Sequence, residues 1–231
     1  MSIAENIAQV RTNIAQACAQ AGRSPEEITL VGASKMNDAA ACLEAIAAGI
    51  DALGENRVQE MTAKLADNAY DGAPLHFIGH LQRNKVKQVV GKVALIQSVG
   101  SMELLEEIEK VAAREQLVQE ILLEVNIGRE EAKSGFDPDA VTAAAEAALS
   151  LPHVRVRGLM TIPPADADRD ANMRYFQEVQ ALYVDINTKL FHNELKCLSM
   201  GMSGDYMDAI RCGATMVRVG TAIFGARNYN I

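Results

Sequence analysis

Residues 28–47 read ITLVGASKMNDAAACLEAIA. The first part, 28–34, is a short run of β-branched and small apolar residues, and an alanine-rich stretch begins near Asp38. This order predicts one buried strand followed by one helix. The junction is Ser34-Lys35-Met36-Asn37 and lacks the GxGxxG turn that usually opens a doubly wound nucleotide-binding sheet.

The same strand-then-helix pattern recurs along the whole chain. From Lys35, at the end of the first expected strand, to Arg218, at the end of the eighth, is 183 residues over seven steps. That is about 26 residues per unit, the size of a βα unit in a parallel sheet. The pattern therefore predicts a closed α/β (β/α)8 TIM barrel. The expected strands are 28–34, 52–54, 75–79, 95–99, 119–127, 154–162, 196–200 and 216–219.

Local signals place the helices between these strands. Ser2 and Glu5 form a capping box that begins an extra N-terminal helix, which Gly22 should end. Ser101 is suited to cap the helix after residues 95–99, and Asp137, followed by Pro138, the helix after residues 119–127.

Composition limits the class of protein. The chain has 231 residues, 49% of them hydrophobic, and its length is that of one large domain, so we expect a single domain over 1–231. The net charge of −8 disfavours nucleic acid and acidic lipid as partners. No secretory signal, membrane span or paired metal-type cysteine spacing is evident. We expect a cytoplasmic protein without a metal, monomeric or weakly dimeric.

Functional groups of a TIM barrel lie where its strands end, so Lys35 is the first candidate. An ammonium at the inner rim is partly desolvated, which should lower its pKa and make the amine a nucleophile toward a carbonyl. The alternative is a lysine that reaches solvent or pairs with Glu55.

The last two strands end in turns rich in glycine and hydroxyl groups. Ser203, Gly220 and Thr221 lie where barrels commonly bind phosphate, although Ser203 could instead cap the following helix. We expect this phosphate site on the opposite side of the rim from Lys35.

Arg218 lies between two valines on the eighth strand. It needs a partner, either the ring nitrogen of a pyridine cofactor or an acid such as Glu124.

These segments together resemble the pyridoxal phosphate homeostasis family, which is similar to the N-terminal domain of alanine racemase. The resemblance spans the chain and rests on VGASK (31–35), GENRVQE (54–60), HFIGHLQRNK (76–85), EVNIGREEAKSGF (124–136), GLMTIPP (158–164), SMGMSGDYMDAI (199–210) and VRVGTAIFGAR (217–227).

The resemblance implies a role for each candidate residue toward pyridoxal 5′-phosphate (PLP). Lys35 would carry PLP as a Schiff base, and Arg218 would face the pyridine nitrogen. Ser203, Gly220 and Thr221 would hold the phosphate, Asn56 and Met200 would line the cofactor, and Lys133 would assist its exchange. The chain departs from the usual pattern at Met36-Asn37 and at His80, which could alter access to the site.

The family implies a non-catalytic protein that carries, buffers or delivers PLP, with apo forms of PLP enzymes as acceptors. One alternative is a racemase of low activity. Racemisation needs a second base, which two-domain racemases take from a tyrosine of an additional C-terminal domain. We expect neither Tyr206, in the seventh helix region, nor Tyr229, in the terminal tail, to replace it. A further alternative is a lysine-dependent aldolase that uses no cofactor.

Overall fold

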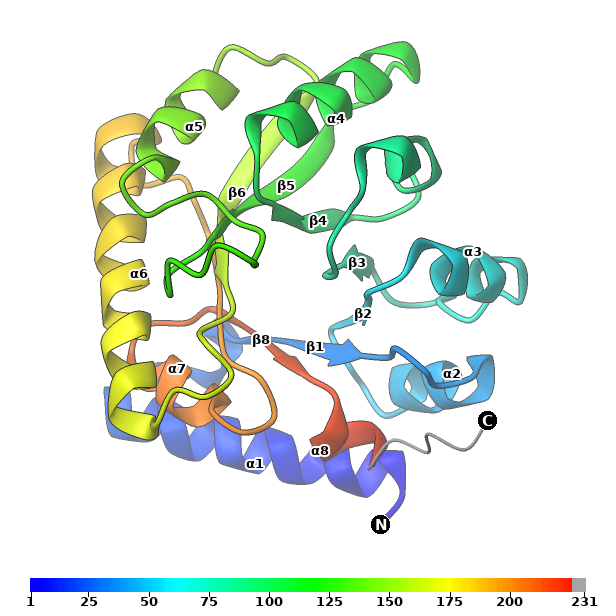
Figure 1. Cartoon of the computed structure of the whole chain (residues 1–231). Helices are drawn as coiled ribbons and strands as arrows, with labels where there is room; N and C mark the ends of the chain where they lie inside the picture. Colours follow the sequence, from blue (N-terminus) through cyan, green and yellow to red (C-terminus); the bar gives the residue numbers. More distant parts are fainter. Residues whose placement is uncertain (226–231) are drawn as a thin grey trace.

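The computed structural model describes residues 1–225 and shows a closed barrel of eight parallel strands in sequence order (Figure 1). The last strand pairs with the first, with Leu30 opposite Val217 and Gly32 opposite Val219, and this pairing closes the sheet. The predicted barrel is thus confirmed. The strands are β1 (Thr29–Ala33), β2 (Ala52–Glu55), β3 (Leu75–Phe77), β4 (Leu95–Val99), β5 (Gln119–Val125), β6 (Val154–Thr161), β7 (Cys197–Ser199) and β8 (Met216–Val219).

Helices surround the barrel (Figure 1). They are α1 (Ile3–Ala21), α2 (Ala39–Ala47), α3 (Val58–Ala66), α4 (Met102–Arg114), α5 (Val141–Ala148), α6 (Arg169–Leu190), α7 (Tyr206–Arg211) and α8 (Thr221–Phe224). Two 3-10 segments, η1 (Pro25–Glu27) and η2 (Arg83–Gln88), complete the described elements.

Helix α1 lies where the short α8 leaves the outer layer incomplete, along α7 and α8 (Figure 1). Its capping box at Ser2 and its left-handed end at Gly22 are both present, as the sequence predicted. Side-chain hydrogen bonds fix it in place: Asn6 Nδ2 donates to the Ile223 carbonyl at 2.8 Å, and Asn13 Nδ2 to the Tyr206 hydroxyl at 2.9 Å. The N-terminal helix thus covers the seam between the first and last strands.

Apolar side chains form two layers separated by the sheet. The larger cluster fills the space between the strands and the helices. A smaller one lies on the other face of the strands, inside the barrel, and comprises Val31, Ala52, Leu95, Leu122, Met160 and Met216. Polar side chains placed among this inner set, such as Gln97 and Arg218, are buried as well.

Two local expectations require correction. Asp137 does not cap α5, which begins at Val141 with no side-chain cap. Its carboxylate instead accepts from the Asp139 amide at 2.9 Å and from Arg129 at 2.8 Å, so residues 137–140 form a turn. The loop after β8, which is expected to bind phosphate, also lies beside the end of β1 and not across the rim from it, because these two strands are neighbours.

No helix within residues 1–225 is both long and apolar enough to cross a bilayer. The four cysteines are free thiols; Cys18 and Cys42 are buried.

Candidate functional site

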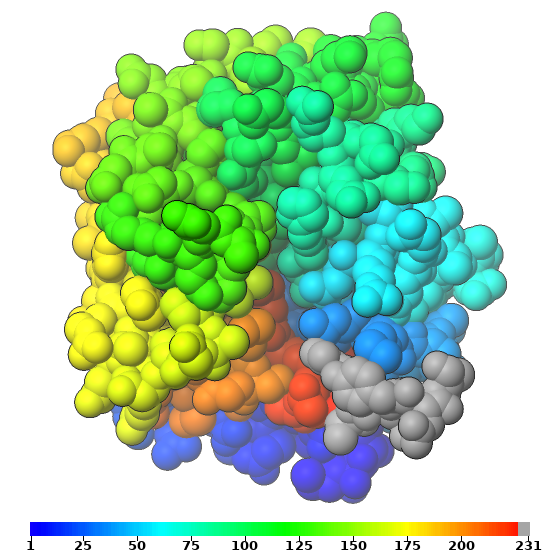
Figure 2. All heavy atoms as spheres, viewed as in Figure 1, coloured from blue at the N-terminus to red at the C-terminus, as the bar shows by residue number. Residues whose placement is uncertain are grey.

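The predicted site residues lie at the carboxyl-terminal end of the barrel. Figure 2 shows this face hollowed between the green connection from β5 to α5 and the blue-green segments facing it, with the orange and red chain of β7 to α8 along its lower edge. Around it lie Lys35 after β1, Asn56 after β2, Lys133 after β5, Met200 and Ser203 after β7, Arg218 in β8, and Gly220 and Thr221 after β8.

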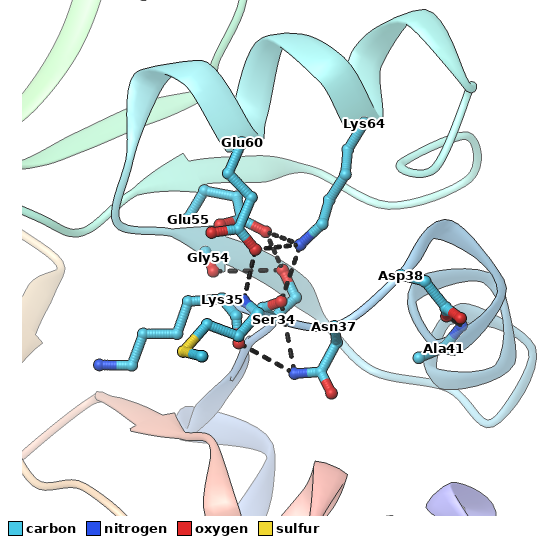
Figure 3. A network of polar contacts seen from close by, with 10 residues as sticks. Ser34, Lys35, Asn37, Asp38, Ala41, Gly54, Glu55, Glu60 and Lys64 are labelled. Atoms are coloured by element: carbon cyan, nitrogen blue, oxygen red, sulfur yellow. Dashed lines mark hydrogen bonds and ion pairs between the residues drawn. The ribbon is translucent and has the colours of Figure 1, made fainter. Parts of the chain in front are cut away.

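Lys35 is half-buried in the turn that follows β1. Glu55 is fully buried, and its Oε1 accepts from Lys64 Nζ at 2.5 Å and from Ser34 Oγ at 2.7 Å. Figure 3 shows the Lys35 side chain extending away from Glu55 and Lys64, over the mouth of the barrel. The partner of Glu55 is therefore Lys64, and Lys35 is presented to the hollow.

Ser203 connects the loops that follow β7 and β8. Its Oγ accepts from the amides of Gly220 at 3.2 Å and Ala222 at 3.3 Å. It does not cap α7, whose N-cap residue is Asp205. Two backbone donors thus converge on one hydroxyl whose own proton can still be donated, and such a group suits an anion with several oxygens.

Close backbone packing shapes the rim at two glycines. Gly201 has φ +91°, and a Cβ there would lie 2.6 Å from the Ala209 side chain and 2.8 Å from Tyr206 Cα. A Cβ on Gly79 would lie 2.2 Å from the Asn56 carbonyl oxygen. Only glycine allows these loops to pack this closely.

Arg218 is only 4% exposed, inside the mouth of the barrel. Nη1 donates to Ser199 Oγ at 2.6 Å and Nη2 to the Thr161 carbonyl at 2.9 Å, which leaves other guanidinium N–H groups to serve a ligand. Burial lowers the pKa of Arg218 to about 10, although the charges of Glu124 and Asp205 oppose this. The group is still a cation at neutral pH. Within the described residues no ion pair joins it to Glu124, the alternative partner considered from the sequence.

A chain of polar side chains, not foreseen from the sequence, supports Arg218 from inside the barrel. Ser199 Oγ donates to Gln97 Oε1 at 2.7 Å, and Gln97 Nε2 lies 3.0 Å from His76 Nδ1. With the amide donating, Nδ1 is an acceptor, so the imidazole is neutral. Burial lowers the pKa of His76 to about 4, which is consistent with this neutral form. The signal available in the sequence was the presence of one or two polar residues within each of three short, otherwise apolar strands.

Asn56 and Met200 differ in the contacts that they can make with a ligand. Met200 is fully buried and can contribute an apolar surface only. Asn56 Oδ1 is buried and has no hydrogen-bond partner among the described residues. A buried oxygen of this kind is costly unless a ligand or water satisfies it. This unpaired oxygen, the Ser203 hydroxyl and the buried Arg218 cation together fit a ligand that carries phosphate and a ring with polar substituents.

Lys133 lies on a separate part of the face. Its Nζ is 2.5 Å from Glu130 Oε2 and 3.4 Å from the Pro163 carbonyl. With His80 and Ser98 it lines a cavity of about 310 Å³, whereas Ser203 and Thr221 line a different cavity of about 540 Å³ that reaches α1. Within residues 1–225 no group of three or more His, Cys, Asp or Glu residues is placed to hold a metal.

Comparison with known proteins gives a family match over almost the whole chain. The family model described as "Alanine racemase, N-terminal domain" matches residues 6–228. The chain is 41% identical over 229 residues to "Pyridoxal phosphate homeostasis protein" of Aquifex aeolicus, a match that covers 99% of this chain and 100% of that one.

Solved structures agree with this match. The structure of PipY from Synechococcus elongatus PCC7942 with PLP bound has a TM-score of 0.85 and 32% identity, covering 97% of this chain and 100% of that chain. An alanine racemase of Clostridium difficile 630 has a TM-score of 0.71 at 18% identity, covering 99% of this chain and 58% of that chain. The latter likeness shows a shared fold.

His76 should make the protein sensitive to acid. Between pH 6.5 and 4 the unfolded chain binds a proton at this imidazole while the folded protein does not, so stability falls as pH falls. From pH 7 to pH 5 we expect wild type to lose about 2 kcal/mol more of its free energy of unfolding than His76→Gln, which cannot titrate. Urea unfolding at both pH values measures this. Equal losses in the two proteins would contradict a neutral, buried His76.

Proposed function

The chain belongs to the family of pyridoxal phosphate homeostasis proteins, and from this we propose that it is a non-catalytic PLP-binding protein. It binds the cofactor at the carboxyl-terminal mouth of the barrel and carries, buffers or delivers it inside the cell. Lys35 is the covalent attachment point. The single observation that carries the proposal is a half-buried Lys35 presented over the barrel mouth, in the turn after β1, which is the neighbour of the strand that leads into the Gly220 loop.

The neighbouring strands give the phosphate and the reactive amine a common support. Gly32 on β1 pairs with Val219 on β8, one residue before Gly220. A Cβ on Gly220 would lie 3.4 Å from Ala33, two residues before Lys35. We propose that Ser203, Gly220 and Thr221 hold the phosphate. Ser203 Oγ accepts from the Gly220 and Ala222 amides, and its own proton would be donated to a phosphate oxygen.

When bound, PLP would supply an aldehyde carbonyl, toward which the neutral amine of Lys35 would be the nucleophile. Arg218 would donate an N–H to the pyridine nitrogen, and because the guanidinium keeps its proton, the ring nitrogen would stay unprotonated. This weakens the ring as an electron sink and suits storage better than carbanion chemistry. Asn56 Oδ1 would accept a hydrogen bond from a ring substituent, and Met200 would pack against the ring.

The contacts of Tyr206 support a carrier over a racemase. A racemase needs a base on each face of the reacting carbon. Tyr206 is 5% exposed, and its hydroxyl accepts from Asn13 of α1, so it is directed toward the outer helix layer. Tyr229, the other tyrosine considered from the sequence, lies outside the described residues. The apo forms of PLP enzymes are the proposed acceptors, and we propose that Lys133, which lines a separate cavity on the same face, assists the exchange.

Replacing Lys35 should remove most of the affinity for PLP. We expect Lys35→Ala to raise the dissociation constant about 100-fold, equivalent to about 2.7 kcal/mol, because the covalent link is lost. The visible absorbance of bound cofactor should disappear as well. Titration with PLP, followed by fluorescence and absorbance, measures both quantities. The matched control is Lys110→Ala, an exposed lysine on α4 that should behave as wild type. Unchanged binding by Lys35→Ala would overturn the proposal.

Carrier and racemase predict different results in deuterated water. We expect PLP-loaded protein incubated with L-alanine to incorporate no more deuterium at Cα than free PLP does, because Tyr206, the described tyrosine considered as a second base, is directed toward α1. Mass spectrometry of the recovered alanine gives the result. Deuterium that rises with protein concentration and is lost in Lys35→Ala would identify a racemase instead.

A further inference from the structure

We propose that Lys64 and Glu60, which lie on α3 outside the barrel, are positioning residues that aim Lys35 at the cofactor. The inference rests on the proposed function, in which Lys35 holds PLP. It concerns the polar cluster formed by Ser34, Glu55, Glu60 and Lys64 behind the ends of β1 and β2 (Figure 3). We call this group the α3 cluster.

Lys64 is the centre of the α3 cluster. Its ammonium has three acceptors: Glu55 Oε1 at 2.5 Å, Ser34 carbonyl oxygen at 2.8 Å and Glu60 Oε1 at 2.9 Å. An ammonium has three N–H donors, so all of them are used. The Lys64 side chain is 8% exposed and that of Glu55 is fully buried. These contacts therefore hold the buried side chains in one arrangement, unlike a mobile ion pair on the surface.

The cluster holds the backbone on both sides of Lys35. On one side, the Ser34 carbonyl accepts from Lys64, and the Ser34 hydroxyl donates to Glu55 at 2.7 Å. On the other side, the Met36 amide donates to Glu60 Oε1. With Ser34 and Met36 both fixed, the direction in which the Lys35 side chain leaves the backbone is fixed too.

Met36 shows that this turn is held against a backbone preference. Its φ is +63°, an uncommon value for a residue with a side chain. Met36 is 51% exposed, so packing of its side chain does not impose this conformation. Such conformations persist where surrounding contacts determine them. At Met36 this contact is the hydrogen bond from its amide to Glu60 Oε1.

The α3 cluster also keeps Lys64 from competing with Lys35 for an aldehyde. Burial alone would lower the pKa of Lys64, but the hydrogen bond and charge of Glu55 and the hydrogen bond of Glu60 outweigh it and raise the pKa above its usual value. Lys64 therefore remains an ammonium, which has no lone pair for an aldehyde. Lys35 projects in the other direction (Figure 3). A buried ion pair is a poor source of net stability, which makes a positioning role the better explanation of this one.

The test removes the Glu60 contacts and measures how well PLP binds and is trapped on Lys35. We expect Glu60→Ala to raise the dissociation constant for PLP about tenfold, since misplacing a reacting group by about 1 Å can cost up to about 100-fold. The fraction of PLP trapped on Lys35 by borohydride at a fixed, sub-saturating concentration should fall in parallel. Glu60→Gln keeps an oxygen that can accept from Met36 and Lys64, and should restore most of the wild-type value.

The matched control acts on the other end of the same strand. Asp51 Oδ2 accepts from the Leu30 amide at 2.6 Å, at the start of β1 and far along the strand from Lys35. Asp51→Ala should lower the melting temperature and leave PLP binding unchanged. If Glu60→Ala likewise lowers only the melting temperature, with wild-type binding and trapping, the cluster is merely structural and the inference is overturned. If wild type itself forms no Lys35 adduct, both the inference and the proposed function fail.

Discussion

The pairing of β8 with β1 is the constraint on which the rest of the structure depends. Four residues of each strand are in register, and this contact turns an eight-stranded sheet into a barrel. Closure places all the carboxyl ends of the strands at one face. It also sets the end of β1, with Lys35, directly beside the loop that begins at Gly220. The proposed attachment lysine and the loop proposed to hold the phosphate thus share one rigid support, and α1 covers the seam between β8 and β1.

Polar groups inside the barrel follow from the need to hold Arg218 there. A buried guanidinium is unfavourable unless its donors are satisfied. Ser199 and the Thr161 carbonyl satisfy two of them, and Gln97 and His76 extend the support across the barrel. The imidazole at the end of this chain stays neutral because it is buried. The arrangement favours a cation fixed in place, with donors left for a ligand.

The sequence predicted most of the fold because the relevant signals are local. Strand 95–99 and strand 216–219 have the predicted bounds, and the caps at Ser2 and Ser101 are present. The Asp137 cap was wrong because a competing contact with Arg129, within a turn, could not be seen in the local pattern.

The candidate site was less predictable, since its contacts join distant segments. The eight candidate residues do lie at the predicted end of the barrel, but Lys133 and Ser203 line different cavities. Neither the contact of Ser203 with Gly220 nor that of Lys64 with Glu55 follows from spacing, because each depends on how separate loops or helices pack.

The measurement that tests the account most directly is peptide mapping by mass spectrometry after borohydride reduction of the wild-type protein mixed with PLP. Reduction makes any lysine adduct permanent, so the modified residue can be identified. The account predicts one adduct per chain, on Lys35. An adduct distributed over exposed lysines, or no adduct, would contradict it. That result would favour a lysine-dependent reaction at the barrel mouth that uses no cofactor.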